Sequence, residues 1–93
     1  MKKVLLWLIL GTKGGINRAR IIKKLNERPY NINQLSKELD VNYRTISHHI
    51  NKLEEMNVVE SYGEKYGKMY LLTDEMNENY DEFKNILEQI EDE

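Results

Sequence analysis

Apolar positions along the chain recur mostly at helical spacing, and one later segment changes to a strand pattern. The residues from Val4 to Leu10 are apolar on every side, which predicts a short helix buried between other elements. After the glycine-rich sequence GTKGG, we expect Asn17 to cap a helix that runs to about Glu27 and is stopped by Pro29. Its inner stripe is Ala19, Ile22 and Leu25 with Ile21 alongside, and its remaining surface is basic through Arg18, Arg20, Lys23 and Lys24.

The next segment predicts two helices joined by a tight turn. The sequence NQLSKELD forms a short helix with Asn33 as its expected cap, and residues 40–42 then separate it from a second helix. Asn42 is a good N-cap for that second helix, which we expect to run from Tyr43 to Met56 or the residue after it. Two helices joined by a turn of about three or four residues form the helix-turn-helix pattern.

A β-hairpin and a last helix are predicted next. Residues 58–62 (VVESY) and 68–72 (KMYLL) are rich in β-branched and aromatic residues, and the loop GEKYG joins them. Gly63 and Gly67 are expected to supply positive φ in this loop. From Asp74 the helical period returns with the spacing of a coiled-coil seam, formed by Met76, Tyr80, Phe83, Leu87 and Ile90.

In this order of elements the chain resembles a winged helix-turn-helix protein, and specifically an ArsR-like transcription regulator of a type common in archaea. The stretches that carry the resemblance are TKGGINRARIIKKL, ERPYNINQLSKELDVNYRTISHHINKLEEMNVV and EKYGKMYLL, and TISHHINKLEEMNVV is the most specific of them. The resemblance implies a mainly α fold with a small β-hairpin wing, extra N- and C-terminal helices, and a DNA-binding core over residues 17–73. It also implies that helix 43–56 lies in the major groove of DNA and that the protein works as a homodimer.

One departure from the family concerns metal ions. Many ArsR-type regulators sense metals through cysteine thiolates or through Asp and His sets on the last helix. This chain has no cysteine and no histidine after His49, so metal sensing is not carried over. We expect no cofactor, and the sequence leaves open whether a small-molecule effector is sensed.

The charge distribution favours a polyanionic partner, although the net charge is −2. Residues 1–73 hold 13 Lys and Arg against 7 Asp and Glu, a net +6, whereas residues 74–93 hold one Lys against 9 Asp and Glu, a net −8. The alternative is that the acidic end is only a solvated helix. The start MKKVLLWLIL is similar to a short signal peptide, but no cleavage site follows and a span needs about 20 apolar residues. We therefore expect a single cytoplasmic domain over residues 1–93, with no membrane association.

His48 and His49 are adjacent in the predicted helix that begins at Tyr43, and their side chains point in different directions. At about 100° per residue, Ile46, Ile50 and Leu53 form the buried stripe, and His48 points directly away from it. His49 falls on the shoulder of the core, where its ring is expected to pack against a neighbouring helix. The two side chains cannot chelate one ion, since helical zinc-binding pairs are spaced four residues apart. No nucleophile or triad accompanies them, so we expect no enzyme activity.

The outward residues of this helix are the candidate DNA contacts. Arg44 is the best candidate for base readout, since a guanidinium can bond both O6 and N7 of guanine, and Asn51 could contact adenine or phosphate. In the wing, Lys65 and Lys68 at a glycine-bounded tip suit phosphate contacts. The sequence GTKGG is no P-loop, because its spacing fails. The complete predicted DNA-binding set is Tyr43, Arg44, Thr45, Ser47, His48, Asn51, Lys52, Lys65 and Lys68.

The two ends of the chain, residues 1–14 and 75–93, are the candidate dimerisation helices. They carry more apolar surface than a winged helix of this size can cover, so we expect an isologous homodimer. The alternative is a monomer in which the two end helices cover each other. The expected function is sequence-specific binding of double-stranded DNA in transcription regulation, and the alternative is a winged-helix module for protein or RNA binding. The expected dimer contacts are Leu5, Trp7, Leu8, Met76, Tyr80, Phe83, Leu87 and Ile90.

Overall fold

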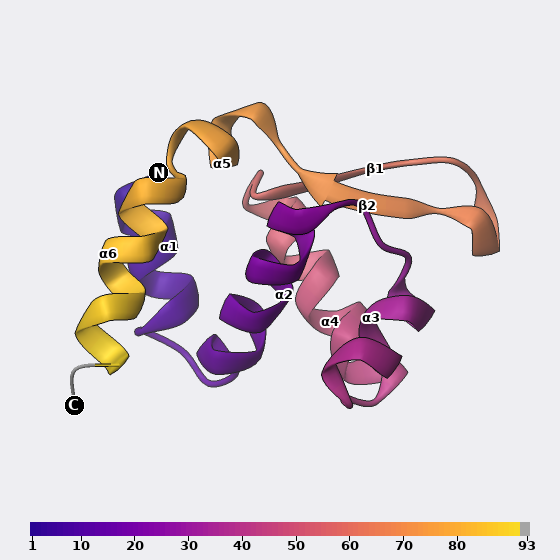
Figure 1. Cartoon of the computed structure of the whole chain (residues 1–93), viewed down its shortest axis with the longest axis horizontal. Coiled ribbons are helices and arrows are strands. Elements are labelled where there is room, and N and C mark those ends of the chain that lie inside the picture. The colour runs from indigo at the N-terminus through magenta and orange to yellow at the C-terminus, as the bar shows by residue number, and fades with distance from the viewer. Residues whose placement is uncertain (92–93) are drawn as a thin grey trace.

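The computed structural model describes residues 1–91 and has the predicted order of helices followed by a hairpin and a helical end. The mainly α fold with a small β-hairpin wing is confirmed, in a body of 37 × 26 × 21 Å. Figure 1 shows α1 and α6 side by side at one end and α3 and α4 at the other, with α2 between them and the hairpin extending above α3. The elements are α1 (Lys2–Ile9), α2 (Gly15–Glu27), α3 (Ile32–Leu39), α4 (Tyr43–Glu55), β1 (Val59–Tyr62), the short 3-10 turn η1 (Lys65–Gly67), β2 (Met69–Leu72), α5 (Asp74–Glu78) and α6 (Tyr80–Glu91).

One hydrophobic core joins all of these elements except η1. The stripe of α4 predicted from the sequence, Ile46, Ile50 and Leu53, is fully buried. It belongs to the same core as Ile22 of α2 and Leu35 of α3, which are also fully buried. Since each such side chain contributes roughly 1.5–3 kcal/mol when it is fully buried, this stripe fixes which face of α4 remains for solvent.

The start of α2 differs from the prediction. Asn17 lies inside the helix, and the N-cap is Gly14, with φ of 85°. Gly15 explains the earlier start, because a Cβ at that residue would lie 1.9 Å from the carbonyl oxygen of Ile9. The glycine pair therefore lets the end of α1 contact the start of α2 directly.

The cap of α3 also differs from the prediction. Asn31 is the N-cap, whereas Asn33 lies inside the helix. The Asn31 side chain accepts a hydrogen bond of 2.7 Å from the Gln34 backbone, and Gln34 Oε1 accepts one of 2.9 Å from the Asn31 backbone. This is a capping box, whose signature is a capping residue followed three positions later by Gln or Glu.

The turn between α3 and α4 is as predicted. It comprises residues 40–42, and Asp40 takes the left-handed conformation with φ of 53° that ends α3. Asn42 caps α4, since its Oδ1 accepts a hydrogen bond of 3.0 Å from the Thr45 backbone. The direction of α4 is therefore fixed both by its cap and by its buried stripe.

The wing is an antiparallel hairpin in which Val59 pairs with Leu72 and Tyr62 with Met69. Tyr70 of β2 also exchanges two backbone hydrogen bonds with Tyr30, of 2.8 and 3.1 Å, which attach the hairpin to the segment before α3. Gly63 has the predicted positive φ, of 90°.

The prediction for Gly67 was wrong, and Lys65 instead takes a positive φ, of 50°. The cause is the 3-10 turn over Lys65–Gly67, in which the Gly67 N–H donates to the Glu64 carbonyl at 3.0 Å.

The predicted single C-terminal helix is divided into α5 and α6 at Asn79. The Asn79 side chain donates a hydrogen bond of 2.8 Å to the Glu75 carbonyl, a local bond that competes with helix continuation. Met76 and Phe83 are fully buried, and so is Ile86, which the predicted seam omitted. The final residues of the predicted dimerisation segment, 92–93, lie outside the described residues.

The capping box predicts that substitutions of Asn31 and Asn33 have different effects on stability. Asn31→Ala should lower the free energy of unfolding by about 1 kcal/mol, because it leaves the Gln34 N–H without its acceptor. Asn33→Ala should change it by less than about 0.5 kcal/mol, because Asn33 is an exposed position inside a helix and alanine favours helices. Urea unfolding followed by circular dichroism measures both values. A larger loss for Asn33→Ala than for Asn31→Ala would contradict this assignment of the cap.

Candidate nucleic-acid interface

The outward face of α4 is polar and exposed along its first two turns. Tyr43 is 52% exposed, and Arg44, Thr45 and His48 are exposed beside it. Asn51 continues this face one turn later. Neither Arg44 nor His48 has a carboxylate partner within the described part of the chain. The face therefore carries hydrogen-bond donors that are free for another molecule.

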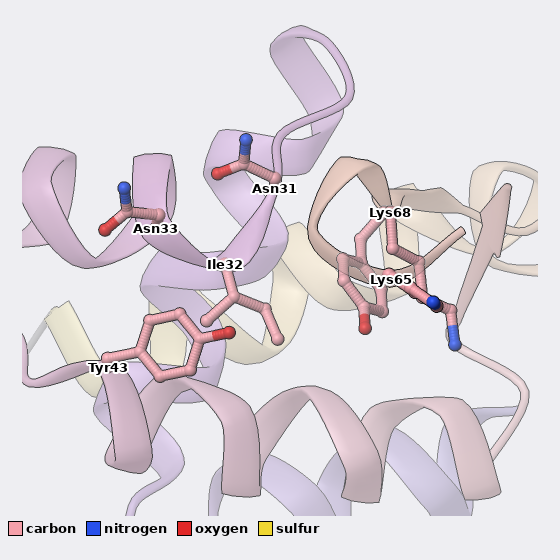
Figure 2. A pocket seen from close by; sticks show the side chains of 7 residues that line it. Asn31, Ile32, Asn33, Tyr43, Lys65 and Lys68 are labelled. Carbon is pink, nitrogen blue, oxygen red and sulfur yellow. The ribbon is translucent and has the colours of Figure 1, made fainter. Parts of the chain in front are cut away.

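A groove that we call the wing groove lies between α3, the start of α4 and the hairpin. Its volume is about 430 Å³. Figure 2 shows the Tyr43 ring beside Ile32 of α3, with Lys65 and Lys68 of the wing across the groove. The structure thus brings together three of the predicted DNA contacts, and it adds Asn33, which sequence reasoning treated only as a cap. The lining residues are Asn31, Ile32, Asn33, Tyr43, Lys65, Lys68 and Tyr70.

A second groove, which we call the loop groove, lies between α4 and the loop that joins α1 to α2. Its volume is about 560 Å³. It brings three predicted contacts, Arg44, Thr45 and His48, together with Lys13, which sequence reasoning did not select. Lys13 lay in the segment assigned to dimerisation, residues 1–14, and its place among glycines was tested for DNA or phosphate contact only as a P-loop, which was dismissed. The lining residues are Lys13, Gly14, Arg18, Asn42, Arg44, Thr45, His48 and His49.

The floor of the loop groove is formed by a buried pair, Arg18 of α2 and His49 of α4. Arg18 was predicted to be on a basic surface, but it is only 4% exposed. Its Nε donates to the Leu8 carbonyl at 2.7 Å, one Nη donates to the Lys13 carbonyl at 2.9 Å, and the Thr12 hydroxyl accepts another bond. The other Nη lies 3.3 Å from His49 Nδ1.

The environment of His49 keeps its imidazole neutral. Because a guanidinium has no acceptor, Nδ1 accepts the hydrogen bond from Arg18 and the proton is on Nε2. Burial lowers the pKa of His49, and the positive charges of Arg18 and His48 lower it further. The predicted packing of the His49 ring against a neighbouring helix is confirmed, but its bonded nitrogen contacts Arg18, 31 residues away in the chain, and not a local group.

Three predicted contacts of α4 line neither groove. Ser47 is half-buried, and Asn51 is exposed beyond the grooves. Lys52 forms an ion pair of 3.2 Å with Glu55, and its Nζ lies 5.9 Å from the centroid of the Trp7 ring. Lys52 therefore extends toward α1, away from the polar start of α4.

The described residues contain no group of three His, Cys, Asp or Glu side chains arranged to hold a metal ion. Among the helices over residues 1–91, none is long and apolar enough to cross a membrane.

One protein-family model matches the part of the chain that forms the helix-turn-helix. The model described as bacterial regulatory protein, arsR family, matches residues 17–61, which run from α2 into β1. Residues 17–61 are thus similar to the ArsR family, and the chain has a winged helix-turn-helix fold. No curated protein sequence matches it significantly.

Solved structures of similar fold include regulators of the winged-helix type. Staphylococcus aureus MarR, in complex with salicylate and kanamycin, has a TM-score of 0.68 at 15% identity. The match covers 82% of this chain but only 53% of that chain. Diamide-treated YodB from B. subtilis has a TM-score of 0.71 at 14% identity, covering 99% of this chain and 90% of its own. Overoxidized AbfR bound to DNA has a TM-score of 0.58 at 18% identity, covering 98% of this chain and 78% of its own. At these identities the likenesses establish only the fold of this chain.

The His49 environment predicts a pH dependence of stability. The unfolded chain binds a proton on His49 near the ordinary pKa of 6.5, whereas the folded chain binds it only at lower pH. Stability is therefore full above about pH 6.5 and falls as the pH drops from there toward the lowered pKa. His49→Asn keeps an acceptor for Arg18 but cannot be protonated, so its unfolding free energy should vary less between pH 7 and 5.

The matched control is His48→Asn, which makes the same change at the exposed neighbour and should keep most of the wild-type pH dependence. Chemical unfolding at a series of pH values measures all three proteins. Equal pH dependence in the wild type and in His49→Asn would show that the pair does not titrate as described.

Proposed function

We propose that this protein is a transcription regulator that binds double-stranded DNA as a homodimer, with α4 in the major groove and the wing on the sugar–phosphate backbone. The observation that carries the proposal is the exposed polar start of α4, flanked on both sides by grooves that hold cationic side chains. The DNA-bound AbfR structure supports it, since a chain of similar fold engages DNA. We further propose that it acts in the cytoplasm and has no enzyme activity.

The dimensions of α4 support its placement in the major groove. Its 13 residues span about 20 Å, and a major groove about 12 Å wide admits an α-helix. Arg44 is proposed to read guanine, and His48 and Asn51 are proposed to approach base edges or phosphate. Tyr43, Thr45 and Ser47 are proposed to hold the backbone, together with the wing lysines, because phosphate contacts fix the register of a reading helix.

The proposed dimer uses the end of the molecule formed by α1 and α6. Leu5, Leu8, Met76 and Phe83 are fully buried within one chain, so their side chains have no surface left for a partner. The predicted dimer contacts with exposed surface are Trp7, which is 43% exposed, and the half-buried Tyr80, Leu87 and Ile90.

The geometry of the dimer follows from where these residues lie. Figure 1 shows α1 and α6 at the end away from α3 and α4, so a two-fold axis there leaves both α4 helices free. Two recognition helices about 34–36 Å apart would fit a palindromic site.

The assignment of Arg44 to base readout is tested by selecting DNA from a random pool. The wild type should enrich a palindrome. Arg44→Ala should lose about 1–3 kcal/mol of discrimination at one base pair per half-site, because it removes a bidentate contact. Lys65→Ala should weaken binding evenly across sequences and keep the same palindrome. Unchanged specificity in Arg44→Ala would refute the proposed orientation of α4, and no enrichment by the wild type would favour a protein or RNA partner.

The dimer is tested by light scattering at micromolar concentration. The wild type should give twice the mass of one chain, which is 11.1 kDa. Leu87→Glu on α6 should shift the mass toward one chain, because it adds a charge to the proposed interface. Tyr62→Glu on the wing, whose side chain is 53% exposed, is the control and should leave the dimer intact. A wild-type mass of one chain would contradict the dimer.

A further inference from the structure

We propose that the loop between α1 and α2 is a third DNA-contacting element, in which Lys13 and the loop groove bind a backbone phosphate on the side of α4 away from the wing. This inference rests on the proposed function. It adds a contact that neither the recognition helix nor the wing supplies.

The loop groove and the wing groove lie on opposite sides of α4. Tyr43 lines the wing groove and Thr45 lines the loop groove. Two positions along a helix correspond to a rotation of about 200°, so these side chains leave α4 in nearly opposite directions. A helix in the major groove has a sugar–phosphate backbone on each side. The two grooves therefore match the two strands that bound the groove, which favours a phosphodiester over a free anion as the occupant.

The position of the loop against α4 is fixed by close packing. Gly14, with φ of 85°, lies so near His49 that a Cβ there would be 2.5 Å from the imidazole Cε1. The Lys13 carbonyl accepts a hydrogen bond of 2.9 Å from the buried guanidinium of Arg18, which also bonds the Thr12 hydroxyl. The backbone of Lys13 is thus held beside α4, while its side chain is exposed at the rim of the groove.

The groups that line the loop groove suit an anion that only accepts hydrogen bonds. Lys13, Arg18 and Arg44 are cationic, Thr45 adds a hydroxyl, and none of the eight lining residues is acidic. The Arg18 guanidinium already donates four hydrogen bonds to acceptors of the chain itself. The Lys13 ammonium and the Arg44 guanidinium, in contrast, bond no other group among the described residues. A phosphate oxygen at the rim would satisfy these free donors.

The test compares two substitutions that remove the same charge. Lys13→Ala removes the proposed phosphate contact, and the control Lys84→Ala removes an exposed lysine of α6, at the other end of the molecule (Figure 1). DNA affinity is measured on one selected duplex and on a scrambled duplex over a series of salt concentrations. Lys13→Ala should weaken binding about two- to fivefold on both duplexes. It should also reduce the slope of log affinity against log salt by about 1 for each protomer bound. Lys84→Ala should keep the wild-type slope.

The phosphate itself is located with duplexes that carry single methylphosphonate substitutions. At one position, a neutral linkage should weaken binding by the wild type but not by Lys13→Ala. This position should differ from the one at which a neutral linkage weakens binding by the wild type but not by Lys65→Ala. Equal salt slopes for Lys13→Ala and Lys84→Ala, with normal binding by the wild type, would overturn this inference alone. A wild type that binds no duplex DNA would overturn the proposed function and this inference with it.

Discussion

The arrangement of the other elements depends on the buried guanidinium of Arg18. A charge removed from water is unfavourable unless its hydrogen bonds are satisfied, and here the acceptors come from three separate places. Leu8 provides a carbonyl at the end of α1, Lys13 provides one in the following loop, and His49 provides a ring nitrogen in α4. Among the described residues no buried side-chain donor or acceptor is without a partner. Displacing α1, the loop or α4 would leave one of these groups unpaired. The contact therefore fixes the position of α4 relative to the end of the molecule formed by α1.

The adjacent histidines acquire separate functions from this contact. A rotation of about 100° between neighbouring helix positions places His49 under the loop and leaves His48 exposed, with ring centroids 5.8 Å apart. Burial, together with the charge of Arg18, lowers the pKa of His49 and disfavours a second charge at the base of the groove, whereas His48 is exposed at the rim. Gly14 belongs to the same contact, because the loop reaches the imidazole only where a Cβ is absent. Of the two adjacent histidines, His49 therefore belongs to the packed interior and His48 to the surface.

What the sequence predicted correctly is local, and what it missed at the candidate site depends on residues distant in the chain. The buried stripe of α4 and the cap Asn42 follow from periodicity and from one side chain beside its own helix. Asn31 was missed as the cap, because the capping box is visible only when Gln34 is considered together with Asn31. The burial of Arg18 could not be read from the pattern of α2, since its acceptors lie 5–31 residues away and an arginine among basic neighbours is usually solvated. The candidate site was predicted on α4 and the wing, and the loop groove was missed because only tertiary packing brings Lys13 to α4.

The basic residues 1–73 and the acidic residues 74–93 differ in charge, and this difference has a local and a global consequence. Locally, the acidic residues of the C-terminal part stand where helix dipoles favour them, with Asp74 and Glu75 in the first turn of α5 and Asp81 and Glu82 in the first turn of α6. Globally, α6 lies at the end of the molecule away from α4 (Figure 1), so the negative charge of α6 is separated from the grooves that hold the cations. A polyanion approaching such a molecule is attracted at the α4 end and repelled at the α6 end. The net charge of −2 is therefore compatible with DNA binding, because orientation depends on where the charges lie and not on their sum.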